Sequence, residues 1–297
     1  MAGGLRLPAD RAGILDWARG HHRDLPWRRT RDPWAVLVSE VMLQQTQVER
    51  VVHRWERFIA RWPTTSACAA ASLGDVLVEW QGLGYPRRAR SLHGAATLVE
   101  AEHGGEFPDE LDVLLTLPGV GPYTARAVLA FAYERDVAVV DTNVGRILAR
   151  RHGGPLTPRQ AQQHADEWVP KGEGWRWNQA LLDVGAQRCR PREPACADCP
   201  VAPRCSWHLA GHPDPDPATG SAGVSRPQRR FEGSARQARG RLLAAMVDGP
   251  VDVADLPAVI GWSGRPDADT ACVTLIDGLV GDGLAVRGDD GRLRLPR

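Results

Sequence analysis

The sequence predicts an all-α protein with a small additional module at its C-terminal end. From about residue 10 to residue 209, apolar residues recur at the three- and four-residue spacing of helices buried on one face. The strongest β-like run in this stretch, residues 137–140, is too isolated to found a sheet. We therefore expect a helical core over residues 1–209, a linker over 210–230 and a separate module over 231–297.

The helical core divides at prolines and glycines. A helix over residues 48–62 has a continuous apolar face and ends at Pro63. Pro122 opens another helix, since proline is favoured at the first helical position. Including that one, further helices are expected over residues 86–103, 109–115 and 122–133.

The end of the chain has a different pattern. Residues 210–230 are rich in proline, glycine, serine and arginine, which is typical of a linker. Within residues 231–297, helical patterns cover residues 235–247, 253–260 and 269–280, and two short β-like runs flank the Gly-Asp-Asp-Gly turn at 288–291. Three helices and a hairpin indicate a winged-helix-like module. Such a module could bind DNA or serve as a protein contact, and the sequence leaves both open.

Composition narrows the class of protein. A hydrophobic content of 43% and a charged content of 25% are ordinary for a globular protein. The net charge of +1 gives no overall basic signal, so a DNA-binding surface would have to be local. No apolar run has the length of a membrane span, and the N-terminus lacks a signal-peptide pattern. We expect a cytoplasmic protein that does not bind membranes.

The cysteines form the strongest compositional signal. Of the six cysteines, four lie close together, at Cys189, Cys196, Cys199 and Cys205. Clustered cysteines in a reducing interior favour a metal site over disulfides. Four thiolates on one loop can hold a 4Fe–4S cluster, in which each iron needs one protein ligand. A structural zinc site is the alternative, because four cysteines also suit zinc.

A glycine-rich turn between two expected helices is the second motif. It reads Leu-Pro-Gly-Val-Gly-Pro-Tyr-Thr-Ala over residues 117–125. Gly119 and Gly121 permit a tight hairpin whose backbone N–H groups point outward at the start of a helix. Such groups bind a phosphate without a basic side chain. The flanking helices and the preceding Leu-Pro favour a helix-hairpin-helix motif.

Two acidic residues stand out by their surroundings. Asp141 follows the apolar run at 137–140 and precedes a helix, so without context it is most simply a helix N-cap. Glu40 lies in an otherwise apolar stretch between Trp34 and Leu43. A carboxylate there is either a solvated helix position or a partly desolvated acid, and the apolar neighbours favour the second.

Together, the hairpin, the following Asp and the four-cysteine loop occur in the order that resembles the endonuclease III superfamily. The resemblance covers about residues 10–209 and is most specific for the A/G-specific adenine DNA glycosylases of the MutY type. The segments that carry it are Leu-Pro-Trp-Arg at 25–28, Ser-Glu-Val-Met-Leu-Gln-Gln-Thr-Gln-Val at 39–48, Gly-Leu-Gly-Tyr at 82–85 and Asn-Gln-Ala-Leu at 178–181. The resemblance implies a two-lobed helix-hairpin-helix glycosylase with a 4Fe–4S cluster loop at 189–205.

The resemblance also implies an activity: base-excision repair of adenine mispaired with 8-oxoguanine or guanine. The base is flipped out of duplex DNA before the glycosidic bond is hydrolysed. Glu40 would be the general acid that protonates adenine N7, and Asp141 would stabilise or bond to the oxocarbenium-like sugar. Tyr123 and Asn143 match positions that support this site. Because Tyr123 stands where bifunctional members have a lysine nucleophile, we expect a monofunctional enzyme.

Further positions follow from the same resemblance. The adenine pocket would be lined by Arg28, Gln179, Leu25 and Trp27. Contacts to DNA would come from Gln45, Thr46, Leu83, Tyr85, Gly119 and Gly121. The expected partner is double-stranded DNA with an A:8-oxoguanine or A:G mismatch, bound by a monomer.

The sequence departs from the family at Pro86, where many members have a second tyrosine, and at residues 231–297. This segment is too short for the Nudix-like domain with which longer members recognise 8-oxoguanine. The sequence therefore does not predict which base the protein prefers opposite adenine. Two rival functions remain. A thymine/uracil mismatch glycosylase shares the tyrosine but lacks the glutamate in this context, and a non-catalytic iron–sulfur DNA-binding protein would have no need of Glu40 and Asp141.

Overall fold

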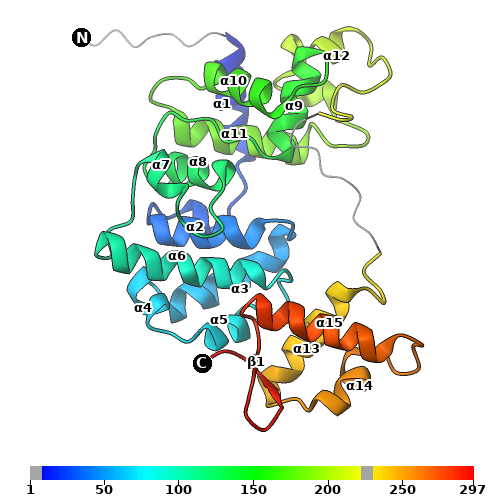
Figure 1. Ribbon diagram of the computed structural model, residues 1–297. Helices are drawn as coiled ribbons and strands as arrows, with labels where there is room; N and C mark the ends of the chain where they lie inside the picture. The colour runs from blue at the N-terminus through cyan, green and yellow to red at the C-terminus, as the bar shows by residue number, and fades with distance from the viewer. Residues whose placement is uncertain (1–8, 222–229) are drawn as a thin grey trace. The chain divides into compact units, whose positions relative to one another are not determined.

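The computed structural model describes residues 9–221 and 230–297, and its elements are labelled in Figure 1. The described chain is mostly helical, which confirms the predicted fold class. It divides into two compact units. Unit 1 comprises residues 1–36, 109–111 and 121–227, and unit 2 comprises residues 37–108, 112–120 and 228–297.

Unit 1 is built around helix α11. Its helices are α1 (Ala9–His21), α8 (Pro122–Phe131), α9 (Thr142–His152), α10 (Pro158–Trp168), α11 (Gly174–Gln187) and α12 (Ser206–Leu209), with short 3-10 turns η1 (Pro26–Arg28), η2 (Cys196–Asp198) and η3 (Ala202–Arg204). Trp177 of α11 is fully buried and packs edge-on against Trp168 of α10, with ring centroids 5.1 Å apart. Large aromatic side chains bury much apolar area, so this pair anchors the core.

The apolar run at 137–140 forms no strand, as its isolation predicts. Its backbone is instead paired with side chains. The buried Asn178 accepts a hydrogen bond from Val139 N and donates one to Val137 O, both 2.8 Å. Because buried backbone groups must find partners, Asn178 substitutes for a neighbouring strand and fixes the chain that leads to Asp141.

Unit 2 begins within α2 (Pro33–Leu43), which starts in unit 1. Its other helices are α3 (Val48–Arg61), α4 (Thr65–Ala69), α5 (Leu73–Glu79), α6 (Arg87–His103) and α7 (Leu111–Leu114). The predicted apolar face of α3 is buried, with Val51 and Phe58 fully covered. Helix α6 ends at Gly104, whose left-handed backbone closes the helix as glycine does best.

The C-terminal part of unit 2 contains the three helices and the hairpin expected from the sequence. They are α13 (Ala235–Asp248), η4 (Val253–Asp255), α14 (Leu256–Ile260), α15 (Ala268–Gly281), β1 (Val286–Arg287) and β2 (Leu293–Arg294). The strands pair antiparallel, with Val286 opposite Arg294. A bridge from Val251 to Leu293 ties the hairpin to the end of α13. We call residues 231–297 the C-terminal module; its winged-helix character stays a prediction.

Part of the predicted linker, residues 216–221, packs against unit 1. Asp216 pairs with the buried Arg150 of α9 at 2.6 Å, and the buried Ser221 accepts a hydrogen bond from Leu156 N at 3.0 Å. These residues are held there because the Asp216 carboxylate pairs with the buried Arg150 guanidinium. The rest of the predicted linker, residues 222–229, lies outside the described residues.

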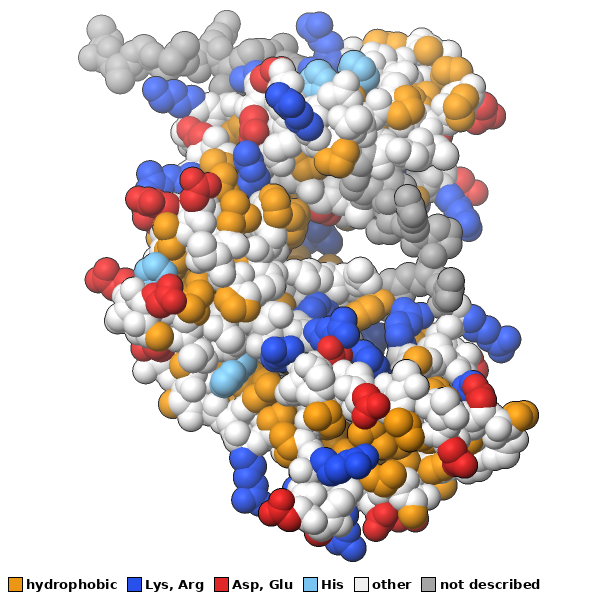
Figure 2. Space-filling model, in the orientation of Figure 1, with side chains coloured by type: hydrophobic (Ala, Val, Ile, Leu, Met, Phe, Trp, Pro, Cys, Tyr) orange, Lys and Arg blue, Asp and Glu red, His pale blue; other side chains and the backbone are white. Residues whose placement is uncertain are grey.

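The surface matches the near-neutral composition. The face drawn in Figure 2 carries both basic and acidic side chains. None of the described helices is long and apolar enough to cross a membrane.

Candidate functional site

Glu40 lies on α2 among apolar side chains. It is 5% exposed, and its neighbours Leu37, Val38, Val41 and Met42 are each 3% exposed or less. Burying a carboxylate without compensation is costly, so such a group is either partnered or protonated. The structure thus bears out the desolvated position that the sequence indicates, and Glu40 has interaction partners there.

Asp141 is the N-cap of α9, the simpler of its two interpretations. Its Oδ1 accepts from Val144 N at 2.7 Å, and its Oδ2 accepts from the Asn143 side-chain amide at 2.8 Å. Burial raises the pKa of this carboxyl, although the hydrogen bonds from Val144 and Asn143 act against that rise. Capping therefore holds the carboxylate in one orientation and does not remove it from the site.

Arg146, one turn further along α9, connects Asn143 to the cysteine loop. Its guanidinium donates to the Asn143 side-chain oxygen at 2.8 Å, to Gly185 O at 2.8 Å and to Cys189 O at 2.5 Å. Sequence reasoning missed this residue, since an arginine on a helix usually faces solvent. Gly185 is required at this point because a Cβ there would lie 2.5 Å from the Asn143 Cβ.

The four clustered cysteines line one cavity together with Arg150 and Trp207. All four thiols are free. Arg150 Nη1 donates to Cys189 Sγ at 3.4 Å. Burial raises the pKa of Cys199 to about 11 and also raises the pKa values of Cys196 and Cys205. A metal that displaces these protons would supply the positive charge that stabilises the thiolates, so the donor set fits a thiolate-bound metal group.

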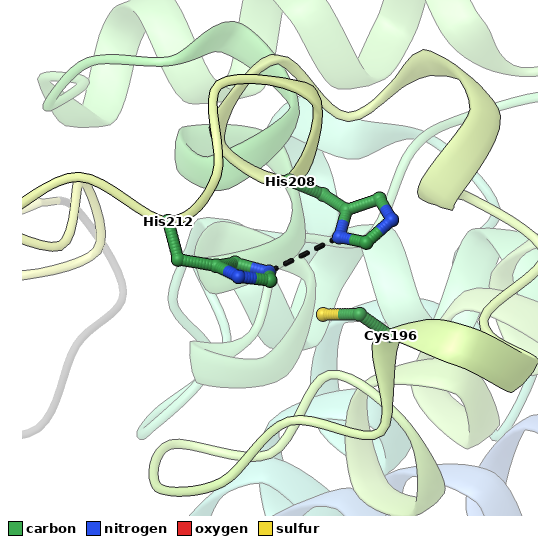
Figure 3. A group of neighbouring side chains, drawn as sticks. All are labelled: Cys196, His208 and His212. Carbon is green, nitrogen blue, oxygen red and sulfur yellow. Dashed lines mark hydrogen bonds between the residues drawn. The ribbon is translucent and has the colours of Figure 1, made fainter.

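Two histidines lie beside Cys196. Figure 3 shows His208 and His212 joined by a 3.1 Å hydrogen bond and turned toward the same space as the Cys196 thiol. The three ligand atoms lie within 4.8 Å of one another, and the four thiols do not form such a group. A single zinc ion holds its ligands at about 2.0–2.3 Å and so needs them close together. Cys196, His208 and His212 are therefore a candidate zinc site beside the four-cysteine loop.

Arg28, in the turn η1, is buried and forms a bidentate ion pair with Asp183 of α11. The two guanidinium–carboxylate hydrogen bonds measure 2.8 and 3.0 Å. Arg23 adds a third at 2.5 Å. Burial alone would raise the pKa of Asp183, but the hydrogen bonds from Arg28 and Arg23 outweigh it and lower the pKa. Asp183 was missed from the sequence, although a buried arginine demands such a partner.

Gln179 lies one helical turn before Asp183 and is 4% exposed. Residues four apart share a face of a helix, so Gln179 lies on the same face of α11 as Asp183, which pairs with Arg28. Its side-chain oxygen is buried without a hydrogen-bond partner. An unpartnered buried acceptor costs about 1–3 kcal/mol, which a donor on a ligand could recover. Trp27 is buried beside Arg28 in η1, and Leu25 is the half-buried residue before that turn.

In unit 2, the loops after α2 and before α6 are held together by Arg88. Its guanidinium donates to Gln44 O at 2.6 Å, to the Thr46 hydroxyl at 3.1 Å and to Leu83 O at 3.0 Å. It also lies 5.4 Å from the centre of the Tyr85 ring. Arg88 is a second residue that sequence reasoning missed, because its partners Gln44 and Thr46 lie 44 and 42 positions away in the chain.

Both of these loops contain a residue with unusual backbone. Gln45 has φ of +57° and Tyr85 has φ of +48°, in the left-handed region that non-glycine residues rarely adopt. Such strain persists where the surrounding structure fixes the residue, and it concentrates at functional sites. Leu83 is buried, Thr46 and Tyr85 are half-buried, and Gln45 is exposed.

The glycine turn has the geometry that the motif predicts. Gly119 has φ of +78°, and a Cβ there would lie 2.6 Å from the Ser91 Cβ. Gly121 is the N-cap of α8, and Pro122 takes the first helical position. Tyr123 follows in the first turn and is half-buried. Of the two predicted acids, Asp141 belongs to unit 1 and Glu40 to unit 2.

Comparison with known proteins identifies the family. Residues 38–171 match the model of the HhH-GPD superfamily base excision DNA repair proteins. Over 296 residues the chain is 43% identical to an adenine DNA glycosylase of Mycobacterium tuberculosis, covering 95% of this chain and 92% of the relative. It is 37% identical over 252 residues to the human adenine DNA glycosylase, covering 74% of this chain and 46% of that protein.

Solved structures agree on the fold. A thermostable thymine-DNA glycosylase superposes with a TM-score of 0.65 at 30% identity, covering 67% of this chain and 95% of that one. An endonuclease III trapped on DNA superposes with a TM-score of 0.60 at 22% identity, over 68% of this chain and 95% of that one. The chain therefore belongs to the adenine DNA glycosylases, within the HhH-GPD superfamily of base excision DNA repair proteins.

Proposed function

We propose that this protein removes adenine opposite 8-oxoguanine or guanine in duplex DNA by hydrolysing its N-glycosidic bond, and that it does not cut the strand. The observation that carries the proposal is Glu40, an acid buried among apolar side chains on α2. Relatives named adenine DNA glycosylases, 43% identical over nearly the whole chain, support the same base.

The first step assigned to the chain is a proton transfer. Glu40 donates a proton to N7 of the flipped adenine, so the base leaves as a neutral species. Positioned proton transfer of this kind is typically worth ~10²–10⁴-fold in rate. Apolar surroundings favour the protonated form of a carboxyl group, which is the form a general acid needs before the reaction.

The second step is charge stabilisation at the sugar. Asp141, in its ionised form, faces the positive charge that develops as the bond to adenine breaks. The hydrogen bonds from Val144 N and the Asn143 amide support the anionic form. The developing cation favours that form further, until water adds to the sugar carbon that held adenine and loses a proton to the solvent, which completes the hydrolysis. Tyr123, at the start of α8, supports this site and offers no amine for a Schiff base, so the strand stays intact.

Base selection belongs to the pocket around Arg28. Gln179 has a buried side-chain oxygen with no partner, which suits the exocyclic amino group of adenine as a donor. Trp27 and Leu25 supply apolar surface beside it. The Asp183 carboxylate fixes the Arg28 guanidinium, so that Arg28 forms a rigid wall of this pocket.

The DNA is bound by a glycine turn and by two loops. The Gly119–Gly121 hairpin binds a phosphate through backbone N–H groups. Gln45, Thr46, Leu83 and Tyr85 enter the duplex next to the orphan guanine, in the loops that Arg88 joins. The protein acts as a monomer.

The cysteine loop holds a 4Fe–4S cluster through Cys189, Cys196, Cys199 and Cys205. When bound, the cluster supplies a cross-link that fixes the loop, and Arg146 and Arg150 bond to that loop from α9. Iron and acid-labile sulfide should be found with the purified protein, which should absorb broadly in the visible region. Stoichiometric zinc in an active, colourless protein would contradict the cluster. In that case, loss of zinc on His208→Ala would place the ion at Cys196, His208 and His212.

The test of the activity is a panel of duplexes with A:8-oxoguanine, A:G, T:G and U:G pairs. Abasic sites are revealed by hot alkali after single-turnover incubation, and strand cutting is read without alkali. We expect adenine release from the first two duplexes and no cutting without alkali. Glu40→Gln is the matched control: it should bind the A:8-oxoguanine duplex nearly as well as the wild type and release no adenine.

A thymine/uracil mismatch glycosylase is the second candidate, favoured by the superposition on a thymine-DNA glycosylase. It predicts base release from the T:G and U:G duplexes. Release from those alone would overturn the adenine assignment. Tight binding of all four duplexes without release would instead indicate a non-catalytic DNA-binding protein.

A further inference from the structure

The C-terminal module reaches the loop that carries Tyr85. Arg236, in the first turn of α13, donates a hydrogen bond from Nη1 to the Tyr85 hydroxyl at 3.0 Å. The two residues are 151 positions apart in the chain and belong to the same compact unit. A charged donor to a tyrosine hydroxyl fixes the far end of the ring, while Arg88 lies over the ring itself.

A second contact fixes the module beside the same loop. Asp282, at the end of α15, accepts from Arg87 Nε at 2.7 Å and from Arg239 Nη1 at 3.3 Å. Its backbone carbonyl accepts from Arg90 Nη1 at 2.7 Å. Arg87 is the first residue of α6 and follows Tyr85 by two positions. The Arg87 side chain is 64% exposed, so that pair alone contributes little, but Asp282 is only 16% exposed and bonds to three arginines.

A third contact lies at the end of the chain. A Cβ on Gly74 of α5 would come within 2.3 Å of the backbone oxygen of Pro296. Only glycine admits so close an approach. The module therefore meets the helical part of unit 2 at three places: the Tyr85 loop, the start of α6 and α5.

The arginines at this contact bond to protein groups. Arg236 of the module bonds to the Tyr85 hydroxyl, and Arg239 of the module and Arg87 of α6 bond to Asp282. A guanidinium that is held by a protein group is less available to a phosphate. These contacts therefore favour a positioning role for Arg236 over phosphate binding.

We propose that the C-terminal module is a positioning element for Tyr85, with Arg236 as its contact residue, and that it sets the preference for the base opposite adenine. The inference rests on the proposed function, because it assigns Tyr85 to the orphan base. Its physical basis is the left-handed backbone of Tyr85, which needs neighbours that hold it. The module therefore acts on recognition of the oxidised base through Tyr85 and does not bind that base itself. Its own pocket, of about 410 Å³, is bordered by Trp262, whose ring is buried and offers no stacking face.

The experiment is a double-mutant cycle in the full-length protein with its metal site loaded. Arg236→Met, Tyr85→Phe and the double variant are compared with the wild type. Arg265→Met is the matched control, since Arg265 lies in the same module, pairs with the exposed Asp267 and lies over the Trp262 ring. Two quantities are measured on 8-oxoguanine and guanine duplexes: the single-turnover rate of adenine release, and the Kd for a duplex with a stable abasic analogue in place of adenine.

We expect Arg236→Met to lower the preference for 8-oxoguanine over guanine by roughly threefold to tenfold, the worth of one ordinary hydrogen bond. Tyr85→Phe should lower it by a similar factor, and the double variant should lose no more than either single variant. Arg265→Met should leave the preference unchanged. Affinity for undamaged duplex should stay the same for Arg236→Met and Arg265→Met, and thermal melting checks that each variant is folded.

Additive losses in the double variant, or an equal loss on both duplexes, would overturn the inference. A uniform fall in affinity with a flatter salt dependence would show instead that Arg236 binds phosphate. The Kd measurement distinguishes a failure of this inference from a failure of the proposed function. If the wild type releases no adenine, the proposed function fails, and the Kd ratio for the abasic duplexes still decides whether the module sets the preference. If adenine is released but the ratio does not change, only the inference fails.

Discussion

Replacement of Asp183 by asparagine tests how unit 1 holds Arg28, which we propose lines the adenine pocket. The Asp183 side chain is fully buried and that of Arg28 is 4% exposed. The carboxylate accepts two hydrogen bonds from Arg28 and two from Arg23, one of these from the Arg23 backbone N–H. Asparagine has nearly the same shape but no charge, so the substitution leaves the Arg28 guanidinium buried without a counter-ion.

The expected loss is large. Breaking a buried ion pair by removing one partner costs about 3–5 kcal/mol, mostly because the remaining charge is desolvated and unpaired. A typical domain has a free energy of unfolding of about 5–15 kcal/mol, so the variant should remain folded but be much less stable. Arg28→Lys should cost less, since lysine keeps the charge but cannot form the bidentate pair.

The pH dependence has a definite sign. The pKa of Asp183 is lower in the folded protein than in the unfolded chain. Its contribution is therefore fully present above the unfolded pKa, about 3.9, and is lost as the pH falls through the lower folded value. Wild-type stability should lose this contribution only in strong acid, and Asp183→Asn should lack that part of the acid loss.

The assay is urea unfolding at neutral pH and again at pH 3, followed by single-turnover adenine release at a temperature at which the variant is folded. Asp24→Asn is the control, because Asp24 pairs with the neighbouring Arg29 at the surface, where both side chains are more than half exposed. The control should unfold like the wild type. If Asp183→Asn were as stable as the control, the argument that Arg28 depends on this carboxylate would be refuted.

Three further predictions concern residues that link parts of a site. Arg146→Met should lower both cluster content and the rate of adenine release, since it frees Asn143 from the cysteine loop; unchanged rates with a full iron content would contradict this link. Arg88→Met should weaken discrimination of the orphan base and lower the melting temperature, because it leaves several carbonyls without a donor, each worth about 1 kcal/mol; an unchanged melting curve would contradict it. Cys199→Ser should lower iron content and stability more than the rate per folded molecule, and the reverse order would place the cluster in the chemistry.

The local features of this chain could be predicted from its sequence. The helix expected over residues 86–103 is found as Arg87–His103, and the one over 235–247 as Ala235–Asp248. The apolar periodicity of a helix and the glycine or proline at its end lie within or next to the helix itself. They therefore predict its bounds without knowledge of the fold. The buried position of Glu40 could be predicted for the same reason, because its apolar neighbours are adjacent in the chain.

The partners of the site residues could not be predicted in this way. Asp183 pairs with an arginine 155 positions away, and Asp282 with one 195 positions away. A charged residue on a helix is usually solvated, so nothing in the sequence distinguishes these acids from their neighbours. The same reason applies to residues 216–221: their composition is typical of a linker, and only the fold shows that Asp216 pairs with the buried Arg150.

Arg146 connects the cysteine loop to Asp141, the carboxylate that we propose acts in catalysis. Helix α9 begins at the cap formed by Asp141, and Asn143 in its first turn bonds to that carboxylate. One turn later, Arg146 bonds both to Asn143 and to the backbone of Cys189. If the proposed cluster fixes the cysteine loop, its loss would free the Cys189 carbonyl that Arg146 holds and would in turn weaken the contact of Arg146 with Asn143. We therefore expect one of the two hydrogen bonds that orient Asp141 to respond to the proposed group, whose first cysteine lies 48 residues later in the chain, although no cysteine needs to touch the substrate.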